Sequence, residues 1–192
     1  KWRKVEEGRK RYFTNSEIKQ LRDFFRDSEY PAMEHFIELG LSTGMRNAEI
    51  LGINQTPDSL PEDMDTFGEV RTRDGQTYVH LRETKNMKPR IIPLAPRALK
   101  AFKALDKNPL KFYDHHKFYQ VWAAARDHIA PGDKEFVPYA ARHTFATNLV
   151  NDSPASDLVV ANRMGHKSLA TTKKYAHPKD ESNTELLNSF VG

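Results

Sequence analysis

The sequence predicts an α+β domain that is mainly helical and contains one small three-stranded antiparallel sheet. Three observations favour this fold class. Apolar residues recur at helical spacing in the first fifty residues and again after position 95. Short strand-like segments lie between these regions, and Asp74-Gly75 joins two of them as in a tight hairpin. No internal repeat or low-complexity tract divides the 192 residues, so we expect one compact domain.

The predicted elements follow from local signals. Thr14 and Glu17 have the spacing of a helix capping box, and Gly40 and Gly44 flank the end of the second helix. The segment 54–67 holds two prolines and four acidic residues and predicts a surface loop. The expected helices cover about 15–27, 31–39, 46–52, 95–105, 115–129, 140–151, 155–163, 168–176 and 182–190, and the expected strands cover 68–73, 77–83 and 89–93.

The composition narrows the classes of partner and of site. A formal charge of +4 and an isoelectric point near 9.2 favour an anionic partner. These residues include no cysteine, which excludes disulfides and thiolate metal sites within them. No stretch approaches the roughly 18 apolar residues of a membrane span, and no signal peptide opens the chain. We therefore expect a soluble cytoplasmic protein.

The most informative residues form two boxes. The first, Thr-Gly-Met-Arg-Asn-Ala-Glu-Ile-Leu, covers 43–51, and the second, Tyr-Ala-Ala-Arg-His-Thr-Phe-Ala-Thr, covers 139–147. Gly-His at 165–166 and then Tyr175, nine residues after the histidine, follow the second box. In this order and at these intervals, the boxes resemble the signature of tyrosine recombinases of the phage-integrase type over about residues 12–180. The resemblance implies a tyrosine-recombinase-like catalytic fold.

The resemblance also implies a role for each residue of the site. Arg46 and Arg142 match the two arginines that clamp the scissile phosphate, and Tyr175 matches the nucleophile. His166 matches a further phosphate contact. Lys85 matches a lysine that the family carries on a turn between strands, where it is suited to protonate the leaving 5′ hydroxyl.

Three further positions complete the predicted site. Glu49 matches a position that supports the first arginine, and His143 is expected to support the site beside the second. Position 139 departs from the family, which usually has histidine there. The hydroxyl of Tyr139 can still bond a phosphate oxygen, but with a pKa near 10 it is a poorer proton acceptor than imidazole at neutral pH.

The residue types suit this chemistry. Attack on a phosphodiester concentrates negative charge on the non-bridging oxygens, and a guanidinium fork bonds two such oxygens at once. Two arginines thus do what a divalent metal does elsewhere, so we expect neither a metal nor a cofactor. The bond energy is kept in a 3′-phosphotyrosine, and no Walker-type glycine loop is present.

Two clusters invite other interpretations. Lys88 and Arg90 lie close to Lys85 in the sequence, and any of the three is open to interpretation as a solvated charge on a hairpin. The Asp-His-His run at 114–116 looks like a metal cluster, but adjacent helix residues point in different directions, which favours a solvated helix start. The aromatic residues between 112 and 122 are interpreted as core.

The resemblance implies site-specific recombination that integrates or excises a mobile element in a bacterial cell. The partners would be a double-stranded DNA attachment site and other copies of the protein in a tetramer, with no membrane involved. Two alternatives remain open: a DNA-binding regulator with impaired catalysis, which Tyr139 favours, and nicking and resealing like that of type IB topoisomerases. We expect an interdomain linker over 1–11, the catalytic domain over 12–180, and a C-terminal helix or tail over 181–192 for contact with another protomer.

Overall fold

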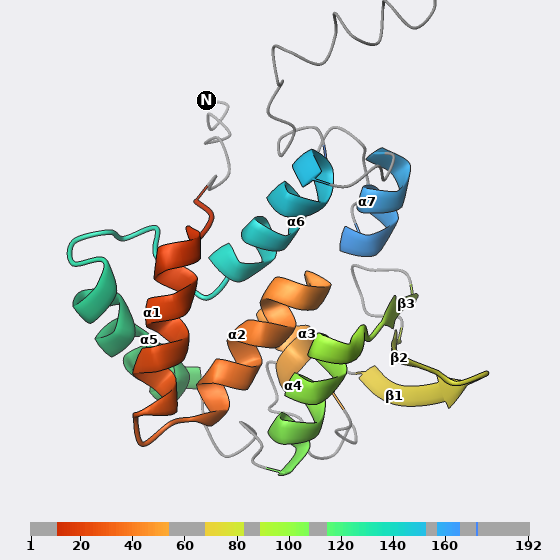
Figure 1. The fold of residues 1–192 in the computed structure, drawn as a ribbon, viewed down its shortest axis with the longest axis horizontal. Helices are drawn as coiled ribbons and strands as arrows, with labels where there is room; N and C mark the ends of the chain where they lie inside the picture. Colours follow the sequence, from red (N-terminus) through yellow and green to blue (C-terminus); the bar gives the residue numbers. More distant parts are fainter. Residues whose placement is uncertain are drawn as a thin grey trace, which may run out of the picture.

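The structure is a computed structural model of the chain, and it describes residues 11–53, 68–82, 89–107, 115–152, 157–165 and 172. Helices precede and follow a small sheet, which lies at one side of them (Figure 1). The helices are α1 (Asn15–Arg26), α2 (Ala32–Thr43), α3 (Asn47–Leu51), α4 (Pro96–Lys107), α5 (His115–Ile129), α6 (Ala140–Asp152) and α7 (Asp157–Met164). The strands are β1 (Gly68–Arg73), β2 (Gln76–Leu81) and β3 (Arg90–Pro93). The predicted α+β class with a three-stranded antiparallel sheet is confirmed. The helices expected at 168–176 and 182–190 lie outside the described residues, apart from Thr172, which is helical.

Helix α1 begins where the sequence predicts. The hydroxyl of Thr14 accepts a hydrogen bond from the backbone N–H of Glu17 at 3.2 Å, and the Glu17 carboxylate accepts one from the N–H of Thr14 at 2.8 Å. Arg11 forms ion pairs with Glu17 and, at 3.0 Å, with Asp133, which precedes α6. Arg11 thereby joins the first turn of α1 to the segment that precedes α6.

Helix α2 lies at the centre of the fold and packs against α1, α4 and α6 (Figure 1). The prediction that Gly40 and Gly44 flank the end of this helix is confirmed, because the helix ends at Thr43, four residues beyond the predicted limit at position 39. A Cβ atom at Gly40 would lie 3.0 Å from the Cβ of Ala141 on α6, so this glycine permits the close approach of two helices. Gly44 then ends α2 in the left-handed conformation, with a φ of 66°.

The sheet has the strand order β1-β2-β3, and both pairings are antiparallel. Asp74 and Gly75 form the turn between β1 and β2 with φ values of 51° and 74°, as a two-residue hairpin turn requires. The predicted hairpin is therefore confirmed. Val79, Leu81 and Ile92 are buried, and they belong to the same core as the helices.

The main core is rich in aromatic rings. Trp122 on α5 packs near Phe13, Phe25 and Phe136, and its indole N–H donates to the carbonyl oxygen of Phe136 at 2.8 Å. This bond satisfies the polar atom of a buried side chain.

The interpretation of the aromatic residues of α5 as core is correct in part. Phe118 and Trp122 are buried, whereas Tyr119 is 42% exposed and was wrongly assigned to the core. Phe112 and Tyr113 lie outside the described residues.

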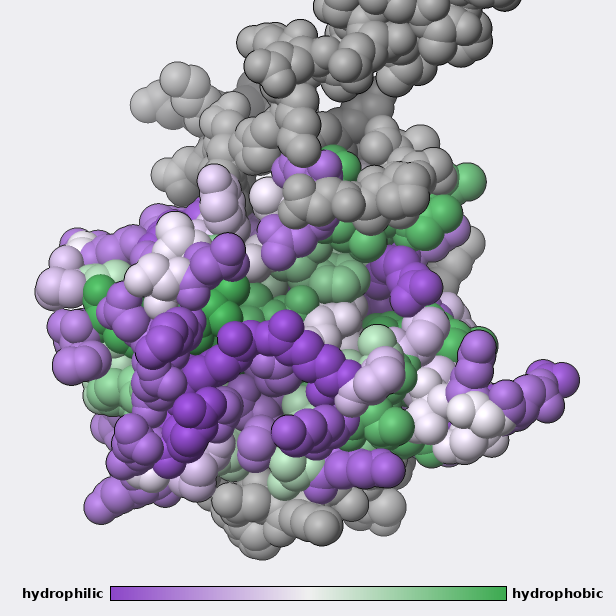
Figure 2. Space-filling view, in the orientation of Figure 1, coloured by the Kyte–Doolittle hydropathy of each residue, from purple (hydrophilic) through white to green (hydrophobic). Residues whose placement is uncertain are grey.

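Helices α6 and α7 share a second, smaller core in which Ala146, Val160 and Met164 are fully buried. On the face seen in Figure 2, hydrophilic residues cover most of the lower half, and hydrophobic residues gather above them. Leu158 and Val159 on α7 are 58% and 46% exposed. Among the described residues, no helix is both long and apolar enough to cross a membrane.

Candidate active site

Arg46 and Glu49 meet at the start of α3. Arg46 is the residue before the first turn, with extended backbone angles, and Glu49 is the third residue of the helix. The Glu49 carboxylate accepts a hydrogen bond from the Arg46 backbone N–H at 2.6 Å and another from Nη1 of its side chain at 3.1 Å. The Arg46 side chain is nevertheless 32% exposed, so its guanidinium is held from the protein side and stays accessible.

Arg90 holds the same carboxylate from the sheet. Its Nη2 lies 2.6 Å from Oε2 of Glu49, and the Glu49 side chain is 1% exposed. Burial alone would raise the pKa of Glu49, but the charge of Arg90 and the hydrogen bonds from Arg90 and Arg46 outweigh it and lower the pKa. Glu49 is therefore a buried anion between two cations.

Arg142 reaches the same region from α6. It is 1% exposed, and Nη1 and Nη2 donate to the carbonyl oxygens of Gly44 and Met164. Its Nε is buried, and no partner for it is found among the described residues. Burial, followed by the nearby charge of Arg46, lowers the pKa of Arg142 to about 10. Arg142 therefore stays protonated at neutral pH, close to a second positive charge on Arg46.

Gly44 fixes the geometry around Arg142. Its carbonyl accepts from the guanidinium, and its left-handed backbone presents the Cα to Phe145 and Met164. A Cβ atom at this position would collide with the ring of Phe145 and lie 2.9 Å from the sulfur of Met164. Only glycine fits this conformation and this space.

Tyr139 and His143 lie together at the start of α6. Their ring centroids are 4.9 Å apart with nearly perpendicular planes, and His143 is 8% exposed. The carbonyl oxygen of Tyr139 accepts the backbone N–H of Arg142 at 3.1 Å.

The two predicted boxes therefore converge in space, and comparison with known proteins decides what they are. The sequence profile of the phage integrase family matches residues 11–182. The chain belongs to this family. The predicted resemblance to tyrosine recombinases is confirmed.

Two curated relatives show the extent of the match. A shufflon-specific DNA recombinase from Escherichia coli is 28% identical over 177 residues, which cover 91% of this chain and 42% of that protein. The tyrosine recombinase XerC of Syntrophus aciditrophicus is 29% identical over 161 residues, which cover 72% of this chain and 46% of that protein. The chain thus spans less than half the length of these relatives.

Solved structures of two integrases share the fold. The catalytic domain of bacteriophage HP1 integrase matches with a TM-score of 0.59 and 21% identity, over 94% of this chain and 95% of that one. A Tn1549 transposon integrase in complex with circular intermediate DNA matches with a TM-score of 0.67 and 20% identity, over 97% of this chain and 69% of that one.

The structure describes part of the site that the family signature predicts. Arg46, Glu49, Tyr139, Arg142 and His143 lie within the described residues and come together around the start of α3 and α6. The predicted residues that lie outside them are Lys85, His166 and Tyr175.

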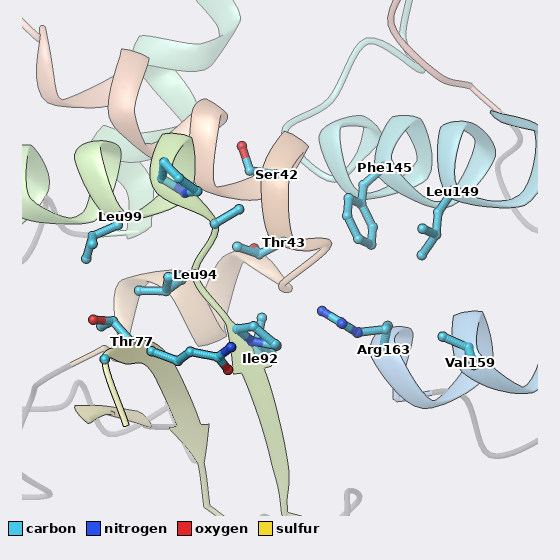
Figure 3. A pocket seen from close by; sticks show the side chains of 15 residues that line it. Ser42, Thr43, Thr77, Ile92, Leu94, Leu99, Phe145, Leu149, Val159 and Arg163 are labelled. Carbon is cyan, nitrogen blue, oxygen red and sulfur yellow. The ribbon is translucent and has the colours of Figure 1, made fainter. Parts of the chain in front are cut away.

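A cavity of about 680 Å³ opens beside this site. Figure 3 shows Phe145 and Leu149 of α6 on one side of it and Ile92 of β3 on another, with Thr43 between them. The guanidinium of Arg163 points from α7 into this space (Figure 3).

Sequence reasoning missed two parts of the site. The interpretation of Arg90 as a solvated charge is wrong, because its side chain is 9% exposed and paired with Glu49. No local sequence pattern indicates that the carbonyl oxygen of Gly44 supports Arg142, since 98 residues separate the two. Of the Asp-His-His run, His116 is exposed and bonds Gln120 at 2.8 Å, and Asp114 lies outside the described residues.

Proposed function

We propose that this chain is the catalytic part of a site-specific DNA recombinase that breaks and rejoins DNA through a covalent bond between Tyr175 and a phosphate. The observation that carries the proposal is the arginine pair. Arg142 bonds the carbonyl oxygen of Gly44, two residues before Arg46, and the charge of Arg46 lowers the pKa of Arg142. Two like charges kept close together, one buried and one partly exposed, form a site suited to a dianionic ligand such as a phosphate in its transition state.

Arg46 and Arg142 would act as the phosphate clamp. Arg46 keeps about a third of its side chain exposed, and Arg142 has a buried Nε donor without a partner among the described residues. Both features suit guanidinium groups that receive additional oxygen acceptors when DNA binds. Because charge builds on the non-bridging oxygens as the phenol attacks, these bonds would strengthen in the transition state and speed the reaction.

Tyr175 would be the nucleophile, and His166 would bond the same phosphate. A free phenol is largely protonated at neutral pH, so the field of the arginine pair would favour its ionised form as it attacks. Tyr139 stands where the family usually has histidine, and it would contribute a hydrogen bond to a phosphate oxygen rather than accept a proton.

Lys85 would complete the reaction by protonating the departing 5′ oxygen. The phosphorus exchanges its bond to that oxygen for a bond to the oxygen of Tyr175, so the product is a 3′-phosphotyrosine and a free 5′ hydroxyl. A second 5′ hydroxyl can then attack and release the tyrosine. The number of ester bonds is conserved, and the cycle needs no nucleotide cofactor.

The relatives support the proposed partner and setting. The Tn1549 integrase was solved with circular intermediate DNA, and the recombinase XerH was solved bound to its difH substrate. We extend this to double-stranded attachment sites of a mobile element, to a tetramer on DNA, and to the segment 181–192 as a contact between protomers.

The test is a covalent trapping assay with the full-length protein. The substrate is a nicked duplex that carries the attachment site, so that cleavage releases a short fragment and religation cannot follow. The parent protein should give a slow band on a denaturing gel, and Tyr175→Phe should give none. Tyr119→Phe is the matched control, because Tyr119 is an exposed tyrosine on α5 and should leave the band unchanged.

Other outcomes would select other functions. If the parent protein binds the duplex and no covalent band forms, the chain is a DNA-binding regulator and the recombinase proposal fails. If a band forms but two attachment sites never exchange strands, the activity is nicking and resealing of the topoisomerase type.

A further inference from the structure

Arg90 occupies an unusual place for a basic residue next to a hairpin. It is the first residue of β3, and its side chain is 9% exposed. Backbone pairing with Leu81 fixes its position on the sheet. Its Nη2 lies 2.6 Å from Oε2 of Glu49, 41 residues earlier in the chain. A buried arginine on one element and a buried glutamate on another thus connect the sheet to α3.

We propose that Arg90 is a positioning residue of the catalytic site, acting through Glu49 on Arg46. This inference rests on the proposed function of Arg46 as a phosphate clamp. Arg90 itself is too deeply buried to serve as a general DNA contact. Its role would be to share the charge of Glu49. This carboxylate then orients Arg46 without drawing its guanidinium into a tighter ion pair, away from the phosphate.

The hydrogen bonds around Glu49 show how the sharing works. Oε2 accepts from Nη2 of Arg90 and from the backbone N–H of Arg46, both at 2.6 Å, while Oε1 accepts from Nη1 of Arg46 at 3.1 Å. The shorter side-chain bond is therefore the one to Arg90. The longer bond is the one to Arg46, whose side chain is 32% exposed.

Removing Arg90 would change both partners. Glu49 would remain buried with a single cation, so it would either draw the Arg46 guanidinium into a tighter pair or take up a proton. In the first case Arg46 turns away from the phosphate, and in the second it loses the carboxylate that orients it.

Net charge leads to the same conclusion. Arg46, Arg90 and Glu49 together carry one positive charge, and without Arg90 they carry none. Arg142 lies near enough for the charges of all three to act on its pKa. The scissile phosphate would therefore meet a weaker positive potential in a variant that lacks Arg90.

The experiment compares cleavage of two substrates by the full-length protein. One is the nicked duplex described above, and the other carries a methylphosphonate at the scissile position, which removes the negative charge of one non-bridging oxygen. Arg90→Met should slow cleavage of the phosphate by about 10- to 100-fold, as the loss of an outer supporting residue typically does. DNA affinity should stay close to that of the parent protein, and cleavage of the methylphosphonate should fall much less.

Two further variants separate positioning from folding. Arg90→Lys keeps the charge but has a single donor group. This variant should cleave the phosphate only several-fold more slowly than the parent protein, and it should cleave the methylphosphonate at the parent rate. Because both substrates are given to the same preparation, the ratio of the two rates does not depend on the fraction of folded protein. In the double variant Glu49→Gln with Arg90→Met, the loss should not exceed that of Glu49→Gln alone.

Arg97→Met is the matched control. Arg97 also pairs with a mostly buried glutamate, Glu38, but on α4 and away from Arg46. It should leave both cleavage rates unchanged. The proposal is overturned if the Arg90 variants cleave both substrates more slowly by the same factor, or if weaker DNA binding accounts for the slower cleavage. It is also overturned if the loss of cleavage rate in the double variant is the sum of the losses in Glu49→Gln and Arg90→Met. Cleavage by the parent protein, with none by Tyr175→Phe, would leave the proposed function standing in each of these cases.

Discussion

Glu49 and Glu38 each accept hydrogen bonds from two arginines, yet the two clusters differ in burial. The Glu49 side chain is 1% exposed, and its partner Arg90 is 9% exposed. The Glu38 side chain is 12% exposed, and its partner Arg97 is 60% exposed. The cluster around Glu38 is therefore more open to water than the cluster around Glu49.

The cluster around Glu38, which we call the surface cluster, joins three helices. Arg22 on α1 donates to Glu38 at 3.0 and 3.2 Å, and Arg97 on α4 donates to the same carboxylate at 2.9 Å. Ser42 adds a hydroxyl donor at 2.9 Å. An ion pair that is open to solvent contributes little free energy, so this cluster orients helices with a small effect on stability. The comparison teaches that one glutamate and two arginines have different roles according to their burial.

The largest expected difference is in stability. Glu49→Ala leaves Arg90 buried without its carboxylate and should lower the free energy of unfolding by about 3 to 5 kcal/mol. Glu38→Ala should lower it by about 1 kcal/mol or less. Urea denaturation of the two variants and the parent protein measures both values. Equal losses would show that burial does not distinguish the clusters.

A smaller difference is expected around the second arginine of the site. Gly44→Ala places a methyl group against Phe145 at a positive φ and should cost about 3 kcal/mol, since steric crowding adds to backbone strain. Gly75→Ala has a similar φ of 74° but open space around it, so it should cost only about 1 kcal/mol.

Thermal unfolding of these two glycine variants provides the measurement. If both variants melt at the same temperature, Phe145 and Met164 do not close the space around Gly44, and close packing does not constrain this turn beside Arg142. If Gly44→Ala alone loses stability, the packing of Phe145 and Met164 on this turn is established as a constraint on the site.

Local signals in the sequence predicted much of the fold. The capping box at Thr14 and the hairpin at Asp74-Gly75 depend on residues a few positions apart, and the structure has both. The packing role of Gly40 was not predicted, because it depends on α6, which lies a hundred residues away. A helix-ending glycine and a helix-packing glycine look alike until the neighbouring helix is known.

The site was predictable to a similar degree. Arg46 and Glu49 are three residues apart on one helix turn, so their pairing follows from spacing. Arg90 meets Glu49 only because the sheet folds against α3, and no periodicity carries that information. The motifs identified the residues of the phosphate clamp, whereas the residue that supports it required three-dimensional contacts.

The first arginines of the two clusters allow the most direct test. Arg46→Lys and Arg22→Lys each keep a charge and remove the planar fork that bonds two oxygens. Single-turnover cleavage of the nicked duplex by both variants should show a loss of at least about 100-fold for Arg46→Lys, since a lost transition-state donor costs that much. Arg22→Lys should cleave at the parent rate. Equal rates for the two variants, at matched DNA binding, would contradict the assignment of Arg46 to the phosphate clamp.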